Sequence, residues 1–305
     1  MKKWPLIVMA AAVLAAGLLI GRFIIPGSDA PAAASAQDAS QSTWDKVKDS
    51  GVLTIGIGED APPYEYLQNG QPIGYDVDIA RAVGQRLSAY AGRTLRLEFV
   101  PVTDEDRITW VQTGQVDMSL AHTNITRTRL ENIDFSLPYG WDGKAILYLA
   151  SDGTRDLASF AGKAVGFKIS SSSVGEIKAY YAARGWKLPD LVQFDNYDAG
   201  IQALLNKQIQ GFTDDTSLIK ASAISMGYKV GPGGTFYLTE PEYSATYYGI
   251  GVRQNDSLWR NEVNYALQDL WKDGEFQKIY NKWFGPHSSD PIPLGNNHID
   301  AYVVG

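Results

Sequence analysis

Apolar residues follow two rhythms along this chain. In some stretches Val, Ile and Leu form short continuous runs, which are typical of strands covered on both faces of a sheet. In others they return every three or four positions, as Ile79, Val83 and Leu87 do, and this spacing predicts helices with one buried face. The pattern predicts strands at 52–57, 95–102, 116–120, 144–150, 164–167, 191–194, 209–213 and 247–252. It predicts helices after Gly74, at 106–112, 173–184, 198–206, 217–226 and 258–272, and at the run that ends before Gly285.

Strands and helices alternate throughout, which predicts an α/β fold with mostly parallel sheets and helices on both faces. The alternation runs through two sets, so we expect two lobes, with the strand at 247–252 returning to the first. In open sheets of this kind, ligands bind beyond the carboxyl ends of the strands. The candidate site therefore lies in the loops that follow Ile57, Leu120, Phe167 and Thr213.

The N-terminus has the order of an export signal. Met1-Lys2-Lys3 is basic, residues 4–21 carry no charge, and Ala34-Ser35-Ala36 fits cleavage after Ala36. A run of about 18 apolar residues can also span a bilayer, so an uncleaved anchor is an equal alternative. We expect residues 1–36 to be a signal peptide or membrane anchor, residues 37–43 to be a linker, and the rest to lie outside the cytoplasm.

The composition limits the kinds of partner and site that the chain can have. The chain has 305 residues, of which 45% are hydrophobic, enough to build large buried cores. Its net charge is -7, and an acidic chain without a basic stripe argues against a nucleic-acid partner. The absence of cysteine excludes disulfides and thiolate sites, and the three histidines lack metal-ligand spacing. We therefore predict no metal and no cofactor.

The four loops together offer groups that match a zwitterion. Arg129 can grip a carboxylate through two hydrogen bonds. The serines at 171–173 precede a predicted helix, whose N-terminus offers backbone N–H groups to the same carboxylate. Asp215, next to Asp214, can accept hydrogen bonds from an ammonium group.

Each of these residues also has an ordinary structural interpretation. A lone arginine is most often solvated, and serines or aspartates before a helix are common caps. Tyr64 and Trp141 either pack on the apolar part of a ligand or belong to the core and its rim. What favours a binding site is that all the polar groups fall on loops at the carboxyl ends of strands.

Several motifs, in a fixed order, are similar to those of a known family. They are Gly51-Val52-Leu53-Thr54-Ile55-Gly56, Pro63-Tyr64-Glu65-Tyr66, Gly74-Tyr75-Asp76-Val77-Asp78-Ile79-Ala80, Ile125-Thr126 with Arg129, Ile133-Asp134-Phe135-Ser136 with Pro138-Tyr139, Tyr248-Gly249-Ile250-Gly251-Val252-Arg253, and Asp273-Gly274 with Trp283-Phe284. In this order they resemble the family 3 extracellular solute-binding proteins, which are polar-amino-acid receptors of ABC importers. The resemblance runs from about residue 44 to residue 285.

The resemblance implies the two-lobed periplasmic-binding-protein type II fold. Lobe one would comprise residues 44–142 and 250–305, lobe two residues 143–249, and two hinge crossings would join them. A periplasmic protein of this kind, expected to be a monomer, closes on a small amino acid and delivers it to the permease of an ABC transporter. It is not expected to be an enzyme.

The resemblance also assigns roles to residues. Those roles are carboxylate binding by Arg129, ammonium binding by Asp215, donation from the second lobe by Ser171 and Ser172, and contacts from the first lobe by Asn124 and Ala121.

The side-chain pocket is less uniform. Two pairs of residues are similar to the glutamate/aspartate branch of the family: Asp104 with Arg107, and Asp214 with Asp215. Lys168 adds a further cation to the same loops. Two positions depart from the family pattern: Gly58 replaces a frequent arginine, and His122 replaces a small residue. The ligand therefore stays open among glutamate, glutamine, aspartate and asparagine.

Two alternatives remain at this point. The carboxylates Glu59, Asp60 and Asp104 favour a ligand with a cationic side chain. They are also possible proton donors for a prephenate or arogenate dehydratase, an enzyme that is similar in sequence and shares this fold.

Overall fold

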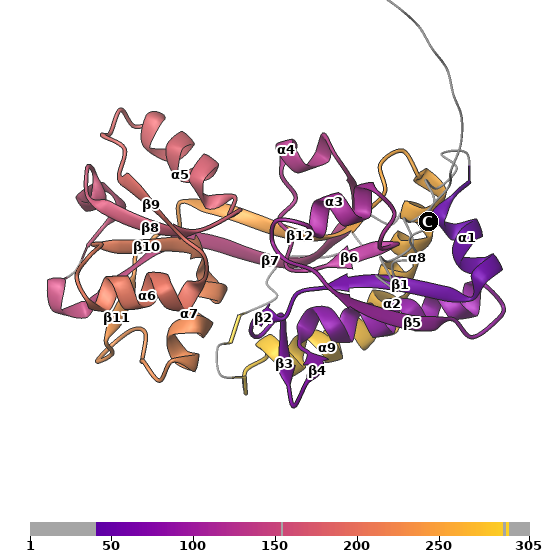
Figure 1. Ribbon diagram of the computed structural model, residues 1–305. Helices are drawn as coiled ribbons and strands as arrows, with labels where there is room; N and C mark the ends of the chain where they lie inside the picture. The colour runs from indigo at the N-terminus through magenta and orange to yellow at the C-terminus, as the bar shows by residue number, and fades with distance from the viewer. Residues whose placement is uncertain (1–40, 154, 289–290, 293–305) are drawn as a thin grey trace, which may run out of the picture. The chain divides into compact units, whose positions relative to one another are not determined.

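Two long antiparallel strands, β7 (Asp134–Leu149) and β12 (Ser244–Val252), form the middle of the main sheet (Figure 1). In this computed structural model the described residues are 41–153, 155–288 and 291–292. The nine-stranded sheet has the order β5-β1-β6-β12-β7-β10-β8-β9, with β11 also on β7. The remaining strands are β1 (Val52–Ile57), β5 (Arg96–Pro101), β6 (Met118–Leu120), β8 (Ala164–Lys168), β9 (Asp190–Phe194), β10 (Gly211–Asp215) and β11 (Phe236–Leu238).

The strands on each side of this central pair are parallel to one another. β1 pairs in parallel with β5 and β6, and β8 pairs in parallel with β9 and β10. The strands β7 and β12 are antiparallel to each other and to their outer neighbours. Parallel neighbours end at the same edge, so the loops after β1 and β6 meet, as do those after β8 and β10.

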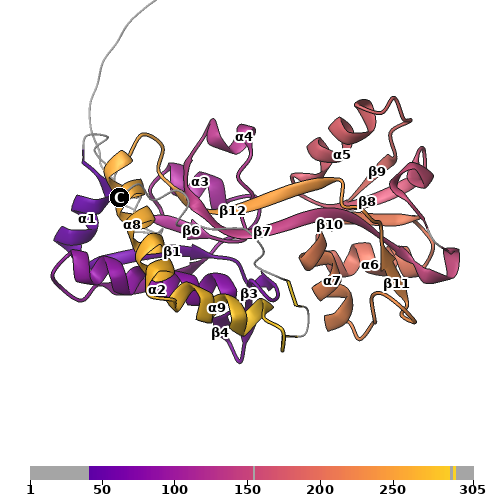
Figure 2. The same ribbon diagram turned by 180° about the vertical axis from the view of Figure 1, so that it is seen from behind.

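Helices cover both faces of the sheet, as the alternation predicted. The helices are α1 (Thr43–Ser50), α2 (Tyr75–Tyr90), α3 (Arg107–Gln112), α4 (Arg127–Leu130), α5 (Ser173–Ala182), α6 (Tyr197–Leu205), α7 (Thr216–Ser225), α8 (Ser257–Lys272) and α9 (Glu275–Phe284), with short 3-10 turns at Ala150–Asp152 and Leu157–Phe160. Helices α8 and α9 pack against α2, and both views place α2 and α9 on the side of the sheet opposite α3 and α4 (Figures 1 and 2). The predicted α/β class is confirmed.

The prediction for the central strand was wrong in length. We expected a strand at 144–150, whereas β7 begins ten residues earlier, at Asp134. Pro138 lies within β7, although proline cannot donate to a sheet ladder. It is accommodated where the register of β7 against β12 shifts, next to Gly249.

A small three-stranded sheet was also missed. Its strands are β2 (Asp60–Ala61), β3 (Glu65–Gln68) and β4 (Gln71–Ile73). Gly74, which follows it, has a φ of 135°, and a Cβ there would lie 2.0 Å from the carbonyl oxygen of Tyr64, so only glycine fits. This close approach seats the loop after β1 against the start of α2.

In the part of the chain that the structure describes, none of the helices has the length and apolar character needed to cross a bilayer. The predicted signal peptide or anchor at 1–36 lies outside the described residues.

Candidate functional site

Side chains from the loops after β6 and β8 and from the end of β10 are joined by hydrogen bonds. Ser172 Oγ donates to Asn124 Oδ1 at 3.0 Å, and Asn124 Nδ2 donates to Asp215 Oδ2, also at 3.0 Å. The loop after β5 joins the same cluster, because Lys168 Nζ lies 2.8 Å from Asp104 Oδ2. The structure thus brings together most of the polar residues that the strand-end rule selected.

Arg129 bridges two of these loops. It lies on α4, whose cap is Thr126, and its own N–H donates to the Thr126 hydroxyl at 3.3 Å. Its Nη1 donates to the carbonyl of Asn124 at 3.0 Å, and its Nη2 donates to the carbonyl of Ser170 at 3.2 Å. A guanidinium has five N–H donors, so these two bonds leave donors for a ligand. Burial lowers the pKa of Arg129 to about 10, which still leaves it charged at neutral pH.

The serine turn, residues 171–173, is hydrogen-bonded to Asp214, so two of its hydroxyls already have an acceptor within the protein. Ser171 Oγ donates to Asp214 Oδ1 at 2.9 Å, and Ser173 Oγ donates to the same atom at 3.2 Å. The N–H of Asp215 is a third donor to it, at 2.9 Å. Within the described residues no hydrogen bond reaches Asp214 Oδ2, so this oxygen is an available acceptor. Burial raises the pKa of Asp214.

Asp215 already has a cation. The ammonium of Lys144 pairs with Asp215 Oδ1, while Asp215 Oδ2 accepts hydrogen bonds from Asn124 and, at 2.7 Å, from the hydroxyl of Tyr248. Lys144 has 0% of its surface exposed and also donates to Ser173 Oγ at 3.1 Å. Although burial alone raises the pKa of Asp215, the adjacent Lys144 brings it below its usual value. Both oxygens of the predicted ammonium acceptor are therefore engaged by the protein.

Arg107, Asp104 and Lys168 form a chain of charges. Arg107 Nη1 lies 2.7 Å from Asp104 Oδ1 and donates to the carbonyl of Ala121 at 2.5 Å. Lys168 lies between Asp104 and Asp60, whose Oδ2 is 3.1 Å away. Burial opposes ionisation of Asp104, but Arg107 holds its pKa well below the usual range. Asp104 is therefore a fixed anion between two cations.

The two departures from the family pattern belong to one buried unit. His122 Nδ1 contacts Glu65 Oε1, and the backbone N–H of His122 donates to Asp76 Oδ2 at 2.7 Å. A Cβ on Gly58 would lie 2.7 Å from Glu65 Oε1, so Glu65 fills the space that a side chain at position 58 would need. Burial, together with Arg107, lowers the pKa of His122 to about 3 and keeps the ring neutral.

The two aromatic candidates lie in different surroundings. Tyr64 is buried, its hydroxyl is 2.9 Å from Ser217 Oγ, and its ring centroid is 5.0 Å from that of Tyr248. Trp141 is half-buried and its ring packs 6.2 Å from that of Phe276. Tyr64 thus packs within the core beneath the site.

Sequence reasoning missed four residues of the site: Asp142, which is half-buried, and Lys144, Glu65 and Tyr248, which are buried. Lys144 had a readable signal, because a lysine at the start of an otherwise apolar strand needs a buried partner. Asp142 Oδ2 accepts a hydrogen bond from the hydroxyl of Ser217, at 2.5 Å, and lies 3.1 Å from the hydroxyl oxygen of Tyr248. Burial and the nearby Asp215 raise the pKa of Asp142 to about 7.

A pocket of about 280 Å³ opens beside the charged chain. Its lining includes the acidic residues Glu59, Asp60, Asp104, Glu105 and Asp195, together with Lys168. In the part of the chain that the structure describes, no group of His, Asp or Glu residues is arranged to hold a metal ion.

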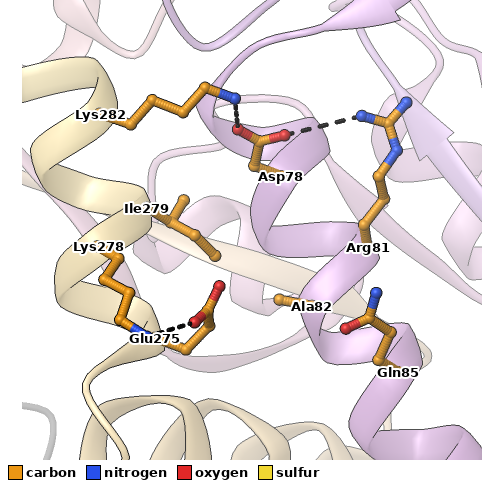
Figure 3. Close-up of a pocket in the computed structure, with 8 residues that line it drawn as sticks. All are labelled: Asp78, Arg81, Ala82, Gln85, Glu275, Lys278, Ile279 and Lys282. Carbon is orange, nitrogen blue, oxygen red and sulfur yellow. Dashed lines mark hydrogen bonds and ion pairs between the residues drawn. The ribbon is translucent and has the colours of Figure 1, made fainter.

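A second pocket, of about 310 Å³, lies between α2 and α9, away from the strand ends (Figure 3). Its charges are already paired, because Asp78 accepts from Lys282 at 2.6 Å and lies 3.7 Å from Arg81. Glu275 is likewise paired with Lys278, at 3.2 Å. We therefore take the strand-end loops as the candidate site.

Comparisons with known proteins agree on one family. Residues 53–286 match the model of the bacterial extracellular solute-binding proteins, family 3. The chain is 26% identical to the L-glutamate/L-aspartate-binding protein of Pseudomonas aeruginosa, over 84% of this chain and 83% of that protein.

Two solved structures are also similar. One is an ancestral arginine-binding protein bound to arginine, with a TM-score of 0.66 and 30% identity, which covers 77% of this chain and 99% of that one. The other is an ancestral amino-acid-binding protein described as a precursor of cyclohexadienyl dehydratase. It has a TM-score of 0.67 and 24% identity, covers 80% of this chain and 100% of that one, and shows likeness of fold alone. The predicted type II periplasmic-binding-protein fold is thereby confirmed, and the chain belongs to the family 3 bacterial extracellular solute-binding proteins.

Proposed function

We propose that this chain is the extracytoplasmic receptor of an ABC importer and that it binds a polar amino acid among the loops after β1, β6, β8 and β10. The observation that carries the proposal is the position of Arg129. Its guanidinium spans the loops after β6 and β8 through two carbonyls and keeps further donors. A carboxylate beside it would also meet the N-terminus of α5, where the helix dipole favours an anion.

The second part of the proposal is that the ligand carries an ammonium group. Acceptors for it lie on Asp214 and Asp215, the last two residues of β10. The names of the curated relatives, such as glutamate-, glutamine- and arginine-binding proteins, support a zwitterion. We propose glutamate, glutamine, aspartate or asparagine, because Arg107 and Lys168 approach the same loops. The acidic lining of the adjacent pocket supports arginine or lysine as the competing class.

We propose further that the ligand is bound by hinge closure of two lobes, residues 44–142 with 250–305 and residues 143–249. Sheet topology supports this partition, because among the described strands β7 and β12 lie between the two parallel sets. Contacts such as Arg129 with Ser170 would then form on closure. The receptor is proposed to act as a monomer that is either released near Ala36 or tethered by its N-terminal segment, and to dock on a membrane permease.

A dehydratase activity is the weaker candidate. It requires a carboxylic acid that can give up a proton in the cleft. Asp104, one of the three candidates named from the sequence, is held ionised by Arg107 and Lys168. The family consists of substrate-binding receptors. Absence of prephenate turnover is the outcome we expect.

The test is a thermal-shift panel of the twenty amino acids on protein that starts at Gln37, followed by calorimetry. A ligand at 100 times its Kd stabilises by about 2.7 kcal/mol, which raises the Tm of a chain of this size by several degrees. We expect one amino acid, or a chemically related few, to do so. A well-folded sample that responds to none of the twenty would refute the proposal.

The matched variants are Arg129→Ala and Arg127→Ala, since Arg127 is exposed on the same helix. Removing one partner of a buried charge pair costs about 2–5 kcal/mol. Arg129→Ala should therefore weaken binding at least about thirtyfold, whereas Arg127→Ala should stay within about twofold. Equal affinities for the two variants would contradict the role of Arg129.

A further inference from the structure

Lys144 occupies the place that the proposed function assigns to the ligand's ammonium group. Its Nζ is buried between the serine turn and Asp215, and it is paired with the oxygen of Asp215 that is not used by Asn124 and Tyr248. A ligand ammonium that binds Asp215 must therefore compete with a cation built into the protein. Leaving Lys144 in place without a partner would cost several kcal/mol, because the side chain has no route to water.

Two other carboxylates lie close enough to Lys144 to become its partners. Its Nζ lies 3.9 Å from Glu176 Oε1 and 3.9 Å from Asp214 Oδ1. A displacement of about 1 Å would bring it to the usual length of a charged hydrogen bond with either group. Glu176 Oε2 is buried without a hydrogen-bond partner in the described residues, and Asp214 is bonded only to hydroxyls and a backbone N–H. Both carboxylates therefore lack the close cation that Asp215 has.

We propose that Lys144 is exchanged between carboxylates when ligand binds. In the free receptor it pairs with Asp215, and in the complex it moves to Glu176 and Asp214 while the ligand's ammonium takes its place on Asp215. This inference rests on the proposed function and deepens it. Lys144 keeps a carboxylate partner in both states, so the receptor avoids the cost of an unpaired buried ammonium and selects ligands that supply an ammonium group.

The placement of Glu176 supports the exchange. It lies in the first turn of α5, the helix whose start is the serine turn, and Lys144 already donates to Ser173 in that turn. The groups proposed for the ligand's carboxylate and for the displaced Lys144 are thus on one rigid helix. Glu176 is consequently a positioning residue that acts on the ligand through Lys144.

The experiment is calorimetry on Glu176→Gln with two ligands that differ only in the ammonium group. The first is the amino acid that binds in the panel, for instance L-glutamine, and the second is its des-amino counterpart, glutaramate (glutarate for L-glutamate). Glu176→Gln should weaken the amino acid about tenfold or more and change the des-amino compound by less than twofold. Lys178→Gln, at an exposed position of the same helix, is the control and should change neither.

A second variant keeps the test independent of Glu176 itself. In a Lys144→Met background no cation needs a new partner, so adding Glu176→Gln should have no further effect on the amino acid. The exchange is overturned if Glu176→Gln leaves amino-acid binding unchanged, if it weakens both ligands equally, or if its effect persists without Lys144. If wild type binds no amino acid at all, the proposed function falls and the exchange falls with it.

Discussion

Two buried polar clusters lie at the strand ends, one around His122 and one around Lys144. His122 is neutral, whereas Lys144 is charged. Around His122, the nearest basic neighbour is Arg107, 3.3 Å from the ring Nε2, and the ring stays neutral. Around Lys144, the neighbours are Asp215, Asp214 and Glu176, and the ammonium stays charged, with its pKa raised above the usual value by Asp215 despite burial.

The difference teaches which cluster can respond to a ligand. In the His122 cluster the arginine, Arg107, is held between Asp104 and the carbonyl of Ala121. The Lys144 cluster has one cation for three carboxylates within 4 Å, so an additional cation can be accommodated there. What separates the two clusters is that Lys144 has alternative carboxylates within 4 Å, to which it can move when a ligand supplies a second cation.

The largest effect that this comparison predicts is on stability. Asp215→Asn should lower the free energy of unfolding by about 2–3 kcal/mol, because Lys144 loses its closest charged partner and keeps only Asp214 and Glu176, each 3.9 Å away. Urea unfolding at neutral pH measures it. The control is Glu275→Gln, which breaks an exposed pair with Lys278 and should cost about 0.5 kcal/mol or less. Similar losses for the two variants would show that the Lys144 pair is not desolvated in solution.

Much of the fold was predictable from the sequence, but little of it indicated which buried acidic side chain contacts which basic one. Apolar runs located the short strands, and the strand-end rule selected loops that do meet. Lys144 and Asp215 are 71 residues apart, and Glu65 and His122 are 57 apart. Which buried acid meets which base depends on how the loops are seated, for example on the close approach at Gly74, and no local pattern records that.

Roles were hardest to predict for two residues of the same type that are adjacent in the sequence. Asp214 and Asp215 are adjacent at the end of one strand, yet they differ in partners, because successive side chains of a strand point to opposite faces. Asp215 meets Lys144, whereas Asp214 meets the serine turn. Only the three-dimensional placement of β7 beside β10 separates them.

The next effect concerns Asp142, which belongs to the Lys144 cluster through Tyr248. Its pKa is raised to about 7, whereas an unfolded aspartate titrates near 3.9. Between these values the folded protein binds the extra proton on Asp142, so the stability that Asp142 contributes is greatest in acid and falls as pH rises towards 7. From pH 5 to pH 7 the loss is about 2 kcal/mol. Asp142→Asn should abolish this component, as urea unfolding at several pH values would show. An unchanged slope in the variant would refute it.

The smallest effect concerns His122, and it has the opposite sign. An unfolded histidine titrates near 6.5, whereas the pKa of His122 is lowered to about 3, so between these values it is the unfolded chain that binds the extra proton. Stability contributed by His122 is therefore complete above pH 6.5 and is lost as pH falls towards 3, by slightly less than 2 kcal/mol between pH 7 and pH 5.

The variant for this test is His122→Asn, since the φ of 37° at this position is one that asparagine tolerates. It should remove the stabilisation that His122 contributes from pH 5 to pH 7. The two single variants, Asp142→Asn and His122→Asn, should therefore shift the pH dependence in opposite directions. NMR gives an independent reading, because the ring signal that disappears in the variant should not titrate above pH 4 in wild type. A ring that titrates near pH 6.5 would place His122 in contact with water and would remove the contrast between the two clusters.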